Sequence, residues 1–315
     1  MGRYAVLRRI EGLDPAVDFR EICRLMVTLE FPWDMNQALS FALFRTYAVP
    51  SIGGLLARTG ELVDRVQKRY DDTVVILDEI LEHGPRDGDG RTALRRMNRM
   101  HGSYAIADDD LRYVLATFVV MPIRWMDAYG WRRFTDVERI AQANYYRELG
   151  RFMGIGDLPA TWQDFSAYLD EYERAHFAFD PGARRVADAT LGLLTTFPPF
   201  SLLPAALVRR MSYALMDDPL LDAFRYPRPN RLVRAVVRMG LAARGRALRF
   251  APPRRRPRYP RDMPQVRSYP HGYDVAALGT FPEREDAVIS TSRSCCSPGS
   301  SPDAPAAASA SGASG

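Results

Sequence analysis

The segment Asp18–Leu29, with the sequence DFREICRLMVTL, contains the pattern that decides the fold class. Apolar side chains recur along it every three or four residues, the interval that brings side chains onto one face of an α-helix. The members of this apolar face are Phe19, Ile22, Cys23, Met26 and Leu29. The segment therefore predicts an amphipathic helix with one buried side.

The same helical period continues along most of the chain. Helices are expected at Met35–Tyr47, shortly after the pair Gly53-Gly54, and from about Gly60 to His83. A helix is expected at Leu111–Met126, with Asp108–Asp110 as its N-cap and a bend near Pro122. Further helices are expected at Arg91–Ile106, Asp136–Met153, Thr161–Phe177, Pro181–Leu194, Pro204–Met216 and Asn230–Leu248. Alternating apolar runs and Asn-Gly hairpin turns are absent from the sequence. An all-α fold follows.

Composition divides the chain into four parts. Residues 1–12 are a lead-in, and residues 13–250 form the predicted single multi-helix domain. Residues 251–282 are rich in proline and arginine, which is typical of an extended arm lying over a surface. Serine, alanine and proline dominate residues 283–315, and this composition predicts a disordered C-terminal tail.

The charged residues and cysteines restrict the class of partner and the compartment. The net charge of +5 comes almost wholly from arginine, because Lys68 is the only lysine among the 315 residues. The stretch Arg244–Arg261 lacks an RNA-recognition or helix-turn-helix context, so we expect no nucleic-acid partner. Cys23, Cys295 and Cys296 do not form a disulfide framework, which favours a reducing, cytoplasmic compartment.

Membrane-directed segments were sought in the apolar runs. Met1–Glu11 interleaves charged and apolar residues and does not resemble a signal peptide. The longest uncharged run, Ala189–Val208, has the length of a transmembrane helix, but Pro198, Pro199 and Pro204 break it. We interpret this run as two short helices that are buried or lie at a membrane surface. The sequence predicts no transmembrane helix and leaves peripheral membrane contact open.

His101 is the most informative of the four histidines. Leu94, Met97 and Tyr104 fall on its helix face, which places the imidazole on an apolar stripe. A buried imidazole needs a partner for each ring nitrogen, because an unsatisfied buried polar group costs about 1–3 kcal/mol. A haem iron could be one partner, with a backbone carbonyl orienting the other nitrogen. The alternative, which the pattern alone favours, is a core histidine with ordinary hydrogen bonds.

Arg69 and Thr73 are four residues apart and therefore share a helix face. An arginine and a hydroxyl group at the edge of an apolar stripe could bind a haem propionate or steady oxygen at an iron. The alternative, again favoured by pattern alone, is a surface arginine that pairs with Glu61, Asp64 or Asp72.

Glu173 and His176 form a Glu-x-x-His pair on a predicted helix. This spacing supplies half of a di-iron carboxylate site in helical bundles. A complete site needs a second such pair, and the sequence contains none, so a structural histidine is the preferred interpretation. A di-iron carboxylate oxygenase is kept as an alternative hypothesis.

Several sequence blocks together resemble the MpaB-type oxygenase and latex-clearing protein (rubber oxygenase) family. The blocks are Phe31–Asp34, Phe44–Pro50, Gln67–Thr73, Arg96–Gly102, Pro122–Trp125, Tyr172–Phe177 and Asp217–Pro219. The resemblance covers about Leu13 to Tyr273. It implies an all-helical domain with a globin-like core that binds haem b.

The resemblance also implies roles for three residues. His101 would be the proximal ligand of the haem iron, with Arg69 and Thr73 in the same pocket. The chain departs from the family at two positions: Asn98 stands where an arginine is expected three residues before His101, and Asp72 stands where a lysine is expected directly before Thr73. The acidic catalytic base of the family has no counterpart at a clear spacing, because neither Glu61 nor Asp64 matches.

These inferences define three hypotheses of function. The first is a haem-b-dependent oxygenase that uses O2 to cleave a C=C bond in an apolar, isoprenoid-like small molecule. The second is a non-catalytic helical protein that binds lipid or the membrane periphery, and the third is the di-iron carboxylate oxygenase. An absorption spectrum of the purified protein distinguishes them, because only the first predicts a Soret band.

Overall fold

The protein was analysed as a computed structural model, which describes residues 2–281 as one compact unit. The helices of its first half are α1 (Ala5–Glu11), α2 (Phe19–Leu25), α3 (Pro32–Thr46), α4 (Pro50–Thr59), α5 (Glu61–Asp64), α6 (Val66–His83) and α7 (Gly88–His101). Those that follow are α8 (Asp108–Tyr129), α9 (Asp136–Phe152), α10 (Trp162–His176), α11 (Pro181–Leu194), α12 (Ala205–Leu215), α13 (Asp218–Phe224) and α14 (Arg231–Ala247). No strand occurs among these residues, so the predicted all-α, single-domain fold is confirmed. The predicted disordered tail, residues 283–315, lies outside the described residues.

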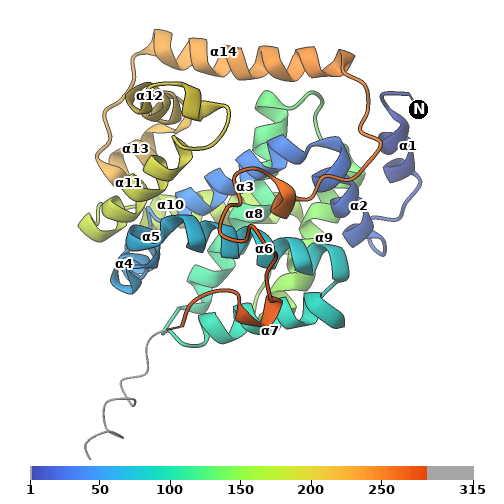
Figure 1. Cartoon of the computed structure of the whole chain (residues 1–315), viewed down its shortest axis with the longest axis horizontal. Helices are drawn as coiled ribbons and strands as arrows, with labels where there is room; N and C mark the ends of the chain where they lie inside the picture. Colours follow the sequence, from blue (N-terminus) through green and yellow to red (C-terminus); the bar gives the residue numbers. More distant parts are fainter. Residues whose placement is uncertain (1, 282–315) are drawn as a thin grey trace, which may run out of the picture. The chain divides into compact units, whose positions relative to one another are not determined.

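Helix α8 is the centre of the core and packs against α3, α9, α10 and α14 (Figure 1). It carries apolar residues on nearly all sides, and Val119, Val120 and Ile123 are fully or almost fully buried. The helix continues through Pro122. Asp108–Asp110 occupy its first turn, and Ala107 is the N-cap residue, so the expected N-cap at these aspartates is wrong. Their negative charges still favour this end of the helix, where the helix dipole is positive.

The predicted helix Asp18–Leu29 changes its winding halfway. Residues 19–25 form α2, and Met26–Glu30 form a π-helical turn in which Phe31 N–H donates to the carbonyl of Met26 at 2.9 Å. The wider turn leaves the carbonyl of Thr28 accepting from Arg258 N–H at 2.9 Å. This hydrogen bond joins residues 230 positions apart in the chain, so no local sequence pattern contains it. It accompanies the departure from the 3.6-residue period.

Two predicted helix boundaries are wrong for steric reasons. Gly53 lies inside α4 instead of before it, and a Cβ atom there would approach the carbonyl oxygen of Tyr47 to 2.2 Å and Ala183 Cβ to 2.5 Å. Glycine therefore allows α4 and α11 to pack closely. Gly60, with φ of +73°, ends α4, and a break at Arg65 separates α5 from α6. Helices α1 and α13, which the sequence analysis did not identify, are each seven residues long.

The proline- and arginine-rich arm, residues 251–281, runs along α6 and reaches α7, as the orange and red trace in Figure 1 shows. It satisfies acidic side chains that α6 buries on this side. The Asp71 carboxylate accepts from the backbone N–H groups of Arg267 and Ser268 at 3.0 and 2.8 Å. Asp72 accepts from Lys68 at 2.8 Å and from the Tyr269 hydroxyl. The arm is therefore an integral part of the packing around α6.

The uncharged run Ala189–Val208 is divided, as expected, into two helices. Leu191, Leu193 and Phe197 are buried, whereas residues 201–207 are exposed. Among the described residues no single helix has both the length and the apolar character needed to cross a bilayer. Helices α3 and α4 reach both only when taken together across a 96° bend.

Candidate functional site

A cavity of about 400 Å³ lies among α3 to α9 and is called here the main cavity. Its walls are largely leucine, isoleucine and methionine side chains. The polar or charged side chains that line it include Arg69, Thr73, His101, Arg58, Glu61 and Asp110. The three residues singled out from the sequence, Arg69, Thr73 and His101, are therefore brought together at one cavity. Such an apolar space with a few polar groups is the usual form of a small-molecule site.

His101 is the last residue of α7. Leu94, Met97 and Met100 on this helix are buried, as the apolar stripe predicts. The helix ends at His101 instead of continuing to Ile106, because the next two N–H groups bond to carbonyls three residues back instead of four: Ser103 to Met100 and Tyr104 to His101, both at 3.2 Å. This early end leaves residues 104–107 free to line the cavity beside the imidazole.

The imidazole of His101 is electrically neutral at physiological pH. Burial, and secondarily the positive charge of Arg69, lowers the pKa of His101 to about 4. Its Nδ1 atom is buried and has no hydrogen-bond partner among the described residues, so the expected backbone carbonyl is not found there. A neutral imidazole with an unsatisfied nitrogen in an apolar cavity has the chemistry of a metal ligand. The residues present therefore fit a haem.

Arg69 is held toward Thr73 one helical turn away. Its Nη1 donates to Thr73 Oγ1 at 2.5 Å, and the threonine hydroxyl donates to the carbonyl of Arg69 at 2.9 Å. Two of the acidic residues expected as alternative partners of Arg69 pair with other residues: Glu61 pairs with Arg65, and Asp72 pairs with Lys68. No acidic side chain lies within ion-pair distance of Arg69 in the part of the chain that the structure describes. The guanidinium can therefore meet an anionic or oxygen-bearing ligand.

Glu61 is a cavity residue that the sequence analysis could not assign. It forms the first turn of α5, and its Oε1 pairs with Arg65. Its Oε2 is buried without a hydrogen-bond partner among the described residues. Asp64, the other acid considered, does not line the cavity. Glu61 directly follows Gly60, whose φ of +73° ends α4, and residue spacing gave no signal that this turn places Glu61 at the cavity.

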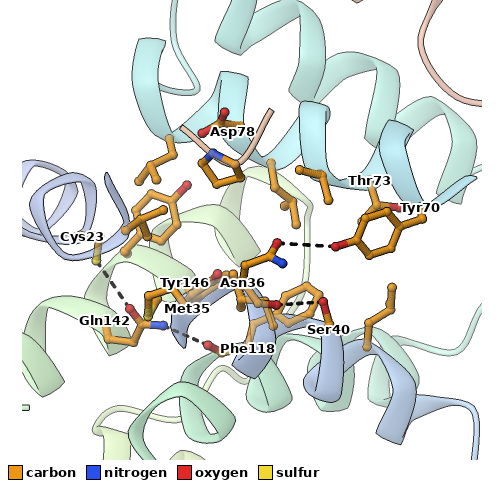
Figure 2. A pocket seen from close by; sticks show the side chains of 18 residues that line it. Cys23, Met35, Asn36, Ser40, Tyr70, Thr73, Asp78, Phe118, Gln142 and Tyr146 are labelled. Carbon is orange, nitrogen blue, oxygen red and sulfur yellow. Dashed lines mark hydrogen bonds between the residues drawn. The ribbon is translucent and has the colours of Figure 1, made fainter. Parts of the chain in front are cut away.

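A second, smaller space of about 80 Å³, called here the side cavity, is shown in Figure 2. It shares lining residues with the main cavity. The residues that line both are Leu43, Thr73, Leu77 and Phe118. Polar groups around the side cavity bond to one another: Gln142 Nε2 donates to the Phe118 carbonyl at 3.0 Å, and Tyr70 lies 3.5 Å from Asn36 Oδ1. The walls left facing the space are mainly carbon, so this cavity is suited to an apolar group.

Glu173 and His176 do not face each other across a metal site. The Glu173 carboxylate is buried and forms two hydrogen bonds with Arg45, at 2.6 and 2.5 Å, and accepts from Tyr113 at 3.2 Å. His176 is exposed, and its Nδ1 lies 2.9 Å from the carbonyl of Tyr172. Arg45 donates to both carboxylate oxygens of Glu173, so this carboxylate stabilises the packing of the fold. The geometry does not support a di-iron centre.

The fold and the main cavity define an all-helical domain with an internal, largely apolar cavity. Residues 35–247 match the family described as ER-bound oxygenase mpaB/B'/Rubber oxygenase, catalytic domain. The chain is 33% identical over 248 residues to ER-bound oxygenase mpaB' of Penicillium brevicompactum, an alignment that covers 73% of this chain and 58% of that protein. It is 32% identical over 216 residues to ER-bound oxygenase mpaB of Penicillium roqueforti (strain FM164), covering 63% and 72%.

The chain therefore belongs to the mpaB/B'/rubber oxygenase catalytic-domain family, a family of oxygenases and hence of oxidoreductases. The resemblance drawn from the sequence blocks is confirmed. The matched residues contain Arg69, Thr73 and His101, and they end before the arm. The chain spans little more than half the length of the P. brevicompactum mpaB' protein that it matches.

Proposed function

We propose that this chain is a haem-b-dependent oxygenase that cleaves a C=C bond in an apolar, isoprenoid-like small molecule. The observation that supports the proposal most is the neutral, unsatisfied imidazole of His101 in the same apolar cavity as the unpaired Arg69. Haem b, when bound, would supply the oxidative chemistry with O2. His101 would hold its iron.

The remaining polar residues of the main cavity would orient ligands and move protons. Arg69, kept in place by Thr73, would donate hydrogen bonds to a propionate or to an oxygen-bearing group in the cavity. Glu61 would accept a proton at its unpartnered Oε2. The apolar walls would exclude water and hold a hydrocarbon substrate, and the side cavity gives that substrate a short branch to occupy.

Haem reconstitution tests the proposal. Wild-type protein and the His101→Ala variant would be titrated with haemin, and the His176→Ala variant would serve as a control, because that exposed histidine lies outside both cavities. We expect wild type and His176→Ala to give the same strong Soret band. His101→Ala should lose the band or shift it to a different ligation state. Equal uptake with identical ligation spectra in all three proteins would show that His101 is not the ligand.

Glu61 is tested separately from haem binding. Glu61→Gln keeps the size of the side chain and removes its ability to act as a base. We expect an unchanged Soret band together with at least a ten-fold loss of turnover on an isoprenoid test substrate. Full turnover in this variant would exclude a proton-accepting role for Glu61.

We also propose that the protein works in contact with a membrane. The relatives above carry the description ER-bound in their names, and an apolar substrate dissolves in lipid. This association applies equally to the non-catalytic, lipid-binding hypothesis. Several apolar side chains exposed on helix α14 favour this association.

A further inference from the structure

Helix α14 lies along an outer edge of the described unit in Figure 1. Several of its apolar side chains are exposed. Leu232 is 71% exposed, Val236 56% and Met239 61%. Their spacing places them on one helix face. The exposed, uncharged residues of this face, called here the α14 stripe, are Leu232, Ala235, Val236, Met239, Gly240, Ala243 and Ala247. A surface helix ordinarily presents polar residues there, so the pattern is reversed.

Three of the five arginines of α14 are engaged with the protein. Arg234 pairs with Asp218 at 2.5 Å, and Arg244 pairs with Asp34 at 2.8 Å. Arg238 donates to the carbonyls of Ala214 and Met216 at 3.1 and 3.3 Å, at the C-terminal end of α12. These contacts fix the rotation of the helix about its axis, so the outward direction of the stripe is a built feature of the fold.

Positive charge surrounds the stripe. Thirteen arginines and no acidic residue occur between Asp222 and Asp262. Arg231 and Arg246 are exposed near the two ends of α14, and Arg254–Arg256 are exposed just beyond it. Phe250, next to these arginines, is 91% exposed. Apolar side chains flanked by unpaired cations are the composition of a helix that lies in the interface of an anionic bilayer.

We propose that the α14 stripe docks onto a lipid surface with anionic headgroups, with the helix parallel to the membrane. A second copy of the chain fits less well, because two copies joined through this face would bring exposed arginines against one another. The nearby acids Asp34 and Asp218 are already paired with arginines of α14. Leu202, Leu203 and Leu207 add further exposed apolar side chains at the start of α12, which packs against α14.

The proposal identifies the surface that would contact the membrane. It rests on the proposed function only in assuming that the protein works at a membrane. It does not depend on haem or on catalysis. Helix α7, with His101, and helix α14 lie at opposite edges of the unit in Figure 1. The α14 stripe would therefore anchor the protein and would not itself be the opening through which substrate enters.

Vesicle flotation of the full chain tests the proposal. The vesicles would be phosphatidylcholine alone, or phosphatidylcholine with about one third phosphatidylserine, a level that gives a negative surface potential. The variant Leu232→Ser/Val236→Ser/Met239→Ser removes the apolar side chains without adding charge. Val17→Ser/Ile140→Ser is the matched control, because both residues are exposed apolar side chains far from α14 in sequence. Circular dichroism and the cooperativity of thermal unfolding verify that each protein is folded.

We expect wild type and the control variant to float with the anionic vesicles, and binding to weaken with added salt. The triple-serine variant should bind at least ten-fold less. Equal flotation of the triple variant and wild type would overturn the proposal, and so would no flotation of wild type. A wild-type dimer in sedimentation that the triple variant dissociates would also overturn it, in favour of a second copy. Vesicle binding that survives loss of haem uptake in His101→Ala separates this inference from the proposed chemistry.

Discussion

The buried ion pair between Arg45 and Glu173 gives a prediction whose size follows from its geometry. The two side chains are 7% and 8% exposed, and two short hydrogen bonds join them. Removing one partner of a buried pair costs about 3–5 kcal/mol, because the other charge is left desolvated. Asp217, 2.7 Å from the same guanidinium and half exposed, remains as a counter-charge. We therefore expect Glu173→Gln to lose about 3 kcal/mol.

Thermal unfolding followed by circular dichroism measures this loss. A domain of this size loses about 2 °C of melting temperature per kcal/mol, so Glu173→Gln should melt about 6 °C lower. Asp222→Asn breaks the exposed pair with Arg228 and should leave the melting temperature within about 1 °C of wild type. If Glu173→Gln melts with wild type, the ion pair does not stabilise the fold. If the variant instead loses bound iron at unchanged stability, Glu173 is a metal ligand and the di-iron alternative returns.

Three further outcomes follow from buried groups. Burial raises the pKa of Asp78 to about 7, so its contribution to stability is full below about pH 4 and is lost as the pH rises through 7. Asp78→Asn should flatten this fall in the free energy of unfolding, measured with urea from about pH 5 to 8. Equal pH slopes in wild type and variant would contradict the prediction. Burial raises the pKa of the Cys23 thiol, so the peptide containing Cys23 should stay unalkylated in native protein at about pH 8 and react after unfolding, as mass spectrometry would show. Asp71→Ala removes the acceptor for the N–H groups of Arg267 and Ser268 and for the Ser268 hydroxyl, so it should speed proteolysis of residues 251–281. An unchanged rate of proteolysis would show that other contacts hold the arm.

The helices were predictable from sequence because their period is local. Segments such as Asp136–Phe152 and Trp162–His176 begin at threonine capping boxes and carry an apolar face, and the structure places them within one residue of the predicted ends. The errors fall where a distant segment decides the backbone. The π-helical turn at Met26–Glu30 accompanies a hydrogen bond from Arg258, and the course of α4 through Gly53 depends on contact with α11.

The candidate site shows the same division. The positions of Arg69, Thr73 and His101 on helix faces were readable from spacing, and the structure brings all three to the main cavity. Which hydrogen bonds they make was not readable. Spacing alone favoured a surface ion pair for Arg69, whereas in the fold no acidic side chain among residues 2–281 lies within ion-pair distance of it. Glu61 could not be assigned from spacing, because its place at the cavity depends on the turn at Gly60 between α4 and α5.

Helix α6 connects the site with the arm through its two sides. One side supplies Arg69 and Thr73 to the main cavity, and the other buries Asp71 and Asp72 against the arm. Two fully buried carboxylates would strongly destabilise this helix without their partners, because each would lose water and gain no hydrogen bonds. The arm supplies backbone N–H groups from Arg267 and Ser268 and the Tyr269 hydroxyl, and the helix itself adds Lys68. The position of α6, and so of its cavity residues, is therefore tied to the docking of a segment that lies beyond the family match.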